Sequence, residues 1–211
     1  ILFEKEKDKK MVPASMTKIM TMLLAMEAIE NGKINLEDEV LISKRAQSMG
    51  GTQIYVEAGS NVKVIDLLKG IGIASANDAA VAIAEKIGGT VENFVNMMNE
   101  RARVLGCKNT TFKNPHGLDE EGHLTTAYDM ALLGSYAIDN EQFLEICSSS
   151  SAVVDYGNPP YKRRLTNHNK LLKIYDGAIG IKTGFTKKSG RCLVSAAERD
   201  GVTLICVTLN D

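Results

Sequence analysis

The chain has 211 residues, of which 25 are basic and 26 acidic, and its net charge is −1 at pH 7. This balance excludes the strongly basic surface that nucleic-acid binding needs, and a hydrophobic share of 44% excludes a disordered chain. Aromatic residues make up 5% and tryptophan is absent, which argues against a stacking platform for bases or sugars. The length fits one large domain or two small ones, and we expect a single catalytic domain over residues 1–211.

The first helix is predicted from a start signal and an apolar run. Residues 1–4 are strand-like and precede a charged turn. The Pro-Ala-Ser string at 13–15 then favours a helix start, and the helix is expected to reach about Asn31, where a glycine follows. Residues 19–26 are apolar on nearly every side, which indicates a central, buried helix. This apolar run is too short to cross a bilayer.

The middle of the chain is predicted to be mostly helical. Short strands and turns are expected over residues 33–60, and Ser60 is interpreted as the N-cap of a helix that starts near Val62. Further helices are predicted over residues 77–86, 91–105 and 126–137. A loop rich in Asn, Pro and Gly is expected over residues 112–122.

The last third of the chain is β-rich. Strands are predicted over residues 178–186, 191–198 and 202–209, joined by short polar turns. Consecutive strands with tight links form an antiparallel sheet. Together with the helical middle, this sheet predicts an α/β fold in which helices flank both faces of an antiparallel sheet.

Three short strings carry most of the chemical information, and they occur in a fixed order. They are Ser-Met-Thr-Lys at 15–18, Ser-Ala-Asn at 75–77 and Lys-Thr-Gly at 182–184. A lone S-x-x-K string arises about once by chance in a chain of this length, and residues 60–63 are such a match. The ordered trio supplies a serine nucleophile, a base and an anion-binding strand, which are the components of acyl transfer through a serine ester.

Ser15 and Lys18 are predicted to act as nucleophile and base. They lie three residues apart at a helix start, so their side chains share one face. Serine is a weak nucleophile until a neighbour removes its proton. Lys18 can do so only when neutral, and burial together with a second cation lowers a lysine pKa. Lys182 is the candidate for that second cation.

The second string is predicted to support the first. Ser75 is a candidate to relay a proton, and the Asn77 amide is a candidate to orient the substrate and Lys18. Taken alone, a Ser-x-Asn string is an ordinary helix N-cap. Its weight comes from the two strings that accompany it.

The third string suits an anionic substrate terminus. Lys182 supplies a cation, and Thr183 and Thr186 supply hydroxyl donors. Gly184 has no side chain, so an extended substrate can approach the strand and pair with it. A predicted oxyanion hole consists of the backbone N–H groups of Ser15 and Phe185.

The remaining reactive side chains indicate no further site. The cysteines show no metal-ligand spacing and are interpreted as buried small hydrophobic residues: Cys107, Cys147, Cys192 and Cys206. Cys192 and Cys206 fall on neighbouring predicted strands, which leaves a disulfide between them open. The histidines are interpreted as structural or surface residues: His116, His123 and His168. We expect no metal and no organic cofactor.

The three strings and their surroundings resemble those of the serine D-alanyl-D-alanine carboxypeptidases, the low-molecular-mass penicillin-binding proteins. The matching stretches extend over nearly the whole chain, at residues 13–21, 75–80, 114–118 and 180–186. The resemblance implies a β-lactamase/DD-peptidase-like fold and removal of the terminal D-alanine from peptidoglycan stem peptides. It also implies that β-lactam antibiotics acylate the protein as substrate mimics.

The resemblance also assigns roles. It makes Ser15 the acyl-enzyme serine and Lys18 the base, with Ser75 and Asn77 assisting, while Lys182, Thr183 and Thr186 hold the terminal carboxylate. It implies a bacterial protein that acts outside the cytoplasm. Family members normally have a strand before the position of Ile1 and further segments after Asp211, among them a membrane anchor. We therefore expect a chain truncated at both ends, with no second domain and with membrane attachment only through segments outside it.

Three alternatives share the same residues. A β-lactamase of this fold needs an extra carboxylate to activate the deacylating water, usually in a Glu-x-x-Leu-Asn segment, which the sequence lacks. A transpeptidase or endopeptidase acting on peptidoglycan cross-links uses the same three strings. A sensor that is acylated once, without turnover, or that only docks peptidoglycan would also retain them.

Overall fold

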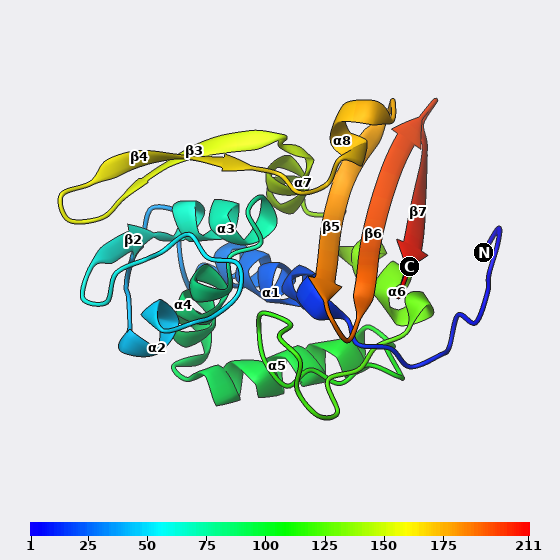
Figure 1. The fold of residues 1–211 in the computed structure, drawn as a ribbon, viewed down its shortest axis with the longest axis horizontal. Helices are drawn as coiled ribbons and strands as arrows, with labels where there is room; N and C mark the ends of the chain where they lie inside the picture. Colours follow the sequence, from blue (N-terminus) through cyan, green and yellow to red (C-terminus); the bar gives the residue numbers. More distant parts are fainter.

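One helix, α1 (Lys18–Glu30), runs through the centre of the protein, and the other elements pack around it (Figure 1). The computed structural model describes residues 1–211. A single turn of 3-10 helix, η1 (Ala14–Thr17), leads directly into α1. Residues 18–26 are all buried, because the apolar run has no polar side that could face water. The predicted central helix is confirmed.

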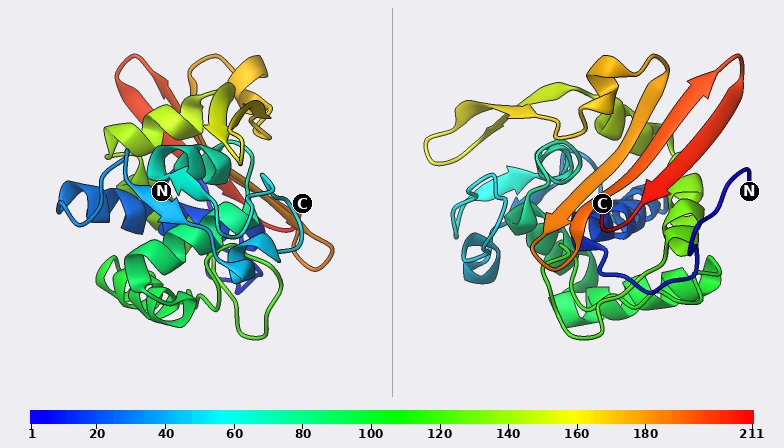
Figure 2. Two further views of the ribbon diagram at one scale, coloured as in Figure 1. Left: turned by 90° about the vertical axis from the view of Figure 1, so that its left-hand side faces the viewer. Right: turned by 45° about the vertical axis from the view of Figure 1, so that its right-hand side comes forward.

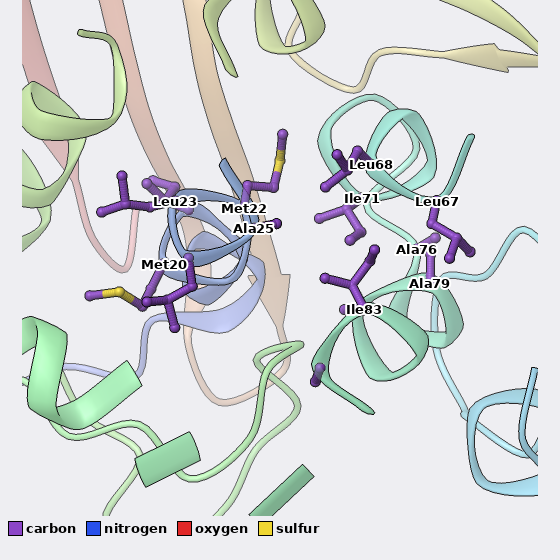
Figure 3. Packing of buried hydrophobic residues seen from close by; sticks show 14 of the residues in the cluster. Met20, Met22, Leu23, Ala25, Leu67, Leu68, Ile71, Ala76, Ala79 and Ile83 are labelled. Carbon is purple, nitrogen blue, oxygen red and sulfur yellow. The ribbon is translucent and has the colours of Figure 1, made fainter. Parts of the chain in front are cut away.

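The helical side of α1 is formed by three longer helices and a short one. Their bounds are α2 (Lys44–Gln47), α3 (Val64–Gly72), α4 (Asn77–Gly88) and α5 (Val91–Val104). Figure 3 shows Met22 and Ala25 of α1 facing Leu68 and Ile71 of α3. A Cβ atom on Gly72 would lie 3.2 Å from the terminal methyl of Met22, so a glycine permits the close approach of α3 to α1.

The C-terminal strands form an antiparallel sheet with the order β5-β6-β7. Their bounds are β5 (Ala178–Thr186), β6 (Gly190–Arg199) and β7 (Val202–Thr208). The helices α6 (Ala127–Ala137) and α7 (Glu141–Ser148) pack against this sheet (Figure 2). Gly134 of α6 lies against Val194 and Ile205. The predicted strands and their antiparallel order are confirmed.

The sequence predicts helices on both faces of the sheet, but in the structure only one face of the β6-β7 pair is covered by a helix. Val202 and Leu204 face away from α6 and are 59% and 53% exposed. Cys206 shares this face, because it lies one alternation beyond Leu204, and it is also exposed. All four cysteines are free. Cys192 is buried on the opposite face from Cys206, so the two cannot form a disulfide, and only Cys206 departs from the predicted burial.

Two short hairpin-like sheets and one single-turn helix make up the remaining secondary structure. They are β1 (Glu39–Leu41) paired with β2 (Asn61–Lys63), the hairpin of β3 (Ser151–Tyr156) with β4 (Tyr161–Thr166), and the one-turn helix α8 (Leu171–Ile174). The β3-β4 hairpin extends over α3 (Figure 1). No element had been predicted over residues 138–177.

Two local predictions are wrong. Residues 1–4 form no strand and are exposed. Ser60 does not cap a helix, because its hydroxyl donates to the Glu57 carbonyl, while residues 61–63 pair with β1 and α3 begins only at Val64. Because residues 61–63 pair with β1, α3 begins two residues later than the predicted start near Val62.

A buried carboxylate fixes the loop that leads to the candidate site. Asp78, in the first turn of α4, is fully buried. Its two oxygens accept hydrogen bonds of 3.1 Å from the backbone N–H groups of Ile54 and Val56 and one of 2.9 Å from that of Ala79. Because a buried N–H without a partner is costly, Asp78 holds residues 54–56 in one conformation beside α4.

We expect Asp78→Asn to lower the free energy of unfolding by about 2–3 kcal/mol, because the amide NH₂ would meet a backbone N–H where the carboxylate accepted one. Urea unfolding at pH 7 measures the loss. Glu57→Gln, which makes the same charge change on an exposed side chain of the same loop, should stay within about 0.5 kcal/mol of the wild type. Equal stability of the two variants would contradict the role of Asp78.

Candidate active site

Lys18 is the centre of the candidate site. Its side chain is fully buried, and its Nζ lies 3.1 Å from Ser15 Oγ, 2.7 Å from Asn77 Oδ1 and 2.6 Å from the carbonyl oxygen of His116. Ser15, in contrast, is only half-buried. The nucleophile predicted from the sequence thus lies open to a ligand, with its predicted base directly beneath it.

The side chains of Lys18 and Lys182 both have lowered pKa values. Burial lowers the pKa of Lys18 well below its usual value, and the positive charge of Lys182 lowers it further. Burial also lowers the pKa of Lys182, to about 8. Both lysines therefore lose their protons at a lower pH than an exposed lysine does.

The partners of Lys18 determine where its lone pair points once it is neutral. A neutral amine has two N–H groups and one lone pair. The Asn77 amide oxygen and the His116 carbonyl can only accept, so they take the two N–H groups. Ser15 Oγ is the one partner that carries a proton to give. The lone pair of Lys18 is therefore directed at the Ser15 hydroxyl, which is the arrangement that proton abstraction requires.

The second string lies at the junction of α3 and α4. Asn77 is the first residue of α4 and its side chain caps nothing, because its Nδ2 donates to the Gly50 carbonyl at 2.7 Å and its Oδ1 accepts from Lys18. Ser75 has a φ of 62°, a left-handed conformation that costs a non-glycine residue about 1–2 kcal/mol. Its Oγ accepts from Lys182 at 3.0 Å and is not bonded to Lys18. Strain of this kind is concentrated at functional sites.

The third string brings β5 against the nucleophile. A Cβ atom on Gly184 would lie 3.1 Å from the backbone nitrogen of Ser15 and 3.2 Å from the Pro13 carbonyl oxygen, so any larger residue would crowd this approach. The backbones of Ser15 and Phe185, the two predicted oxyanion-hole residues, are thereby brought side by side. β5 is an edge strand of its sheet, and its outer edge has no strand partner.

The predicted loop at 112–122 is confirmed, and it contacts the site more closely than its sequence indicated. A Cβ atom on Gly117 would lie 1.9 Å from the Ala14 carbonyl oxygen. The Thr21 hydroxyl donates to the Pro115 carbonyl at 2.6 Å. Thr17 Oγ1 lies 2.8 Å from Nε2 of the fully buried His123, whose Nδ1 accepts the Lys113 N–H. The loop is thus fastened to η1 and α1 around the nucleophile.

Comparison with known proteins agrees with this geometry. The sequence profile of the D-alanyl-D-alanine carboxypeptidases, peptidase family S11, matches residues 1–211. The chain belongs to this family. It is 47% identical over 209 residues to the D-alanyl-D-alanine carboxypeptidase DacF of Bacillus subtilis (strain 168), covering 98% of this chain and 53% of that protein. Identity to DacC of Escherichia coli (strain K12) is 38% over 217 residues, with 99% and 53% covered. The chain therefore spans about half the length of these relatives.

Solved structures of the family share the fold. The D-alanyl-D-alanine carboxypeptidase DacD from Francisella tularensis superposes with a TM-score of 0.95 at 34% identity, covering 100% of this chain and 62% of that one. Penicillin binding protein 5 from Haemophilus influenzae gives a TM-score of 0.92 at 35% identity, with 100% and 61% covered. The predicted DD-peptidase-like fold, in which helices pack against an antiparallel sheet, is confirmed.

Several residues around the site of this family member had not been predicted. The contribution of His116 is its backbone carbonyl, which accepts from Lys18, and Asp119 accepts a 2.8 Å hydrogen bond from Thr186. The His168 residue is largely exposed, but partial burial of its ring lowers its pKa, and the positive charges of Lys182 and Lys18 lower it further. The only sequence signal for His116 was the Asn-Pro-His-Gly-Leu match at 114–118, and this match ends one residue before Asp119.

The structure contains no group of three or more His, Cys, Asp or Glu side chains placed to hold a metal ion. None of its helices is both long and apolar enough to span a membrane.

The buried histidines couple stability to pH. Burial lowers the pKa of His123 to about 4 and that of His116 to about 3, against 6.5 for an ordinary histidine. Between pH 6.5 and 4 the unfolded chain therefore binds more protons than the folded one, so the free energy of unfolding falls as the pH falls through this window.

We expect His123→Gln to flatten this dependence. The wild type should lose more stability than the variant between pH 6.5 and 4, by up to about 2–3 kcal/mol. Urea titrations at several pH values measure both curves. His168→Gln, at an exposed position, should keep most of the wild-type slope. An unchanged slope in His123→Gln would show that His123 is not kept neutral by burial.

Proposed function

We propose that this chain is the catalytic domain of a serine D-Ala-D-Ala carboxypeptidase, which removes the terminal D-alanine from peptidoglycan stem peptides and is acylated by β-lactams. The observation that carries the proposal is the contact between Ser15 Oγ and the buried Lys18 amine, whose pKa is lowered. Because peptidoglycan lies outside the cytoplasm, we place the protein in the bacterial cell envelope.

In the acylation step, neutral Lys18 takes the proton of the Ser15 hydroxyl while Oγ attacks the carbonyl carbon of the last peptide bond. The backbone N–H groups of Ser15 and Phe185 stabilise the oxyanion that forms, and each donor of this kind is worth about 10²–10³ in rate. The Asn77 side chain keeps Lys18 in place and faces the substrate backbone.

Collapse of the tetrahedral intermediate breaks the peptide bond. The departing amine of D-alanine needs a proton, and Ser75, which is hydrogen-bonded to Lys182, is proposed to relay to it the proton that Lys18 took from Ser15. Lys18 is then neutral again before deacylation begins. The products of this step are free D-alanine and a Ser15 ester of the shortened peptide. Water then attacks the ester, Lys18 takes the water proton, and Ser15 leaves with a proton restored.

The substrate is proposed to bind along the free edge of β5. An extended peptide can pair with β5, because the outer edge of this strand has no strand partner. The terminal carboxylate then lies among Lys182, Thr183 and Thr186. Lys182 supplies the charge, and the hydroxyls supply directional donors.

The serine acyl-enzyme is tested by intact mass after addition of excess benzylpenicillin. We expect a long-lived adduct on the wild type and none on Ser15→Ala. Ser60→Ala is the matched control, because it removes the serine of the chance S-x-x-K match and should label normally. Release of D-alanine from a D-Ala-D-Ala peptide should fall by about 10³-fold or more in Ser15→Ala. An adduct that disappears as the drug is destroyed would indicate a β-lactamase, and an unlabelled wild type would overturn the proposal.

The role of Lys182 in lowering the pKa of Lys18 is tested by a pH profile. The rate of acylation by benzylpenicillin should rise with pH as Lys18 loses its proton. Lys182→Met removes the neighbouring cation, so the pKa of Lys18 should rise and the ascending limb should move to higher pH. Lys188→Met makes the same charge change on an exposed side chain and should leave the limb in place. Coincident limbs in wild type and Lys182→Met would contradict this role.

A further inference from the structure

The hydroxyl of Thr186 is already engaged in the free protein. Its Oγ1 accepts the Ser189 backbone N–H at 3.0 Å, and it lies 2.8 Å from Asp119 Oδ1. A carboxylate cannot donate, so the single hydroxyl proton of Thr186 goes to Asp119. The Ser189 hydroxyl, at 3.2 Å, is a more distant and uncharged acceptor. A ligand carboxylate can therefore accept a hydrogen bond from the Thr186 hydroxyl only if the hydrogen bond from Thr186 to Asp119 is broken.

Asp119 is carried by a loop with little freedom to withdraw. Next to it, the Leu118 carbonyl accepts from the Asn114 side chain at 3.0 Å, and Gly117 lies against the Ala14 carbonyl. The Leu118 side chain approaches Gly51 on the opposite side of the site. The loop thus holds the Asp119 carboxylate beside the end of β5.

The charge of Asp119 is not neutralised by a close partner. No lysine, arginine or histidine forms an ion pair with it within 4 Å, and its side chain is exposed. A second carboxylate at Thr186 would therefore lie beside a full negative charge. Two carboxylates that contact the same hydroxyl group lie close together. At that separation in a largely aqueous environment, the repulsion between like charges changes affinity several-fold.

We propose that Asp119 is a specificity-determining residue that competes with the substrate carboxylate for the Thr186 hydroxyl. The proposal rests on the function proposed above, in which Thr186 binds that carboxylate. Asp119 weakens the binding of substrate and of released D-alanine alike, because both present a carboxylate. It therefore raises KM and speeds product release without taking part in bond making, and a change in such uniform binding alters KM and leaves kcat nearly unchanged.

The direct test is a binding measurement that does not depend on turnover. Calorimetry would compare the affinity of a D-Ala-D-Ala peptide for Ser15→Ala with that for the double variant carrying Ser15→Ala and Asp119→Asn. We expect the double variant to bind about threefold to tenfold more tightly at low salt. The difference should nearly vanish at about 1 M salt, where exposed charges are screened. Glu121→Gln, the same charge change on an exposed neighbour, should leave the affinity unchanged.

Two further variants separate charge from positioning. Asp119→Asn keeps an acceptor oxygen for Thr186, whereas Asp119→Ala removes it. Competition by charge predicts tighter binding in both variants, and in the Ser15 enzyme it predicts a lower KM with kcat within about twofold. A purely positioning role predicts no change in Asp119→Asn and weaker binding in Asp119→Ala. Unchanged or weaker binding in Asp119→Asn overturns the proposal. A wild type that binds the peptide but releases no D-alanine would instead refute the proposed function.

Discussion

The site depends on the complete burial of the Lys18 amine, which would be charged in water and whose desolvation costs free energy. Lys18 has no carboxylate partner, and its three neighbours are a hydroxyl, an amide oxygen and a backbone carbonyl. Burying an unpaired ammonium is so unfavourable that the group gives up its proton instead. The same burial that costs stability thus creates a base of moderate strength next to a serine. The strained backbone at Ser75 and Ala14 belongs to the same site.

Those parts of the fold that follow from local pattern could be predicted from the sequence. The apolar run of α1 predicts a buried helix, and the three β-rich segments with short links predict an antiparallel sheet. Both predictions were confirmed, whereas helix cover on both faces of β6-β7 was not. The β3-β4 hairpin was missed because only a few side chains of residues 151–166 are buried, so neither strand has a continuous core-facing side. Ser60 was misassigned because β2 exists only through its pairing with β1, some twenty residues away, and local propensity carries no trace of that contact.

The site also contains residues that the sequence predicted and residues that it did not. Ser15, Asn77 and Lys182 were found because their chemistry is specific to their side chains, and the fold brings them together with Lys18. The roles assigned to them from the sequence remain predictions. The His116 carbonyl escaped notice because any residue has a carbonyl, so residue type gives no signal. Asp119 escaped notice because an exposed aspartate in a loop is ordinary until the partner across the site is known. Burial of His116 and His123 likewise depends on tertiary packing, not on their polar local sequence.

The contacts that define the site join segments far apart along the chain. Lys18 meets Asn77 across 59 positions and His116 across 98, and Ser75 meets Lys182 across 107. Contacts of such high sequence separation raise the contact order, and their loop-closure entropy is paid before they contribute any stability. The site therefore forms only when segments from the whole length of the chain are packed together. An N-terminal fragment that ends before Asn77 would contain Ser15 and Lys18 but neither of the two acceptors that orient the Lys18 amine.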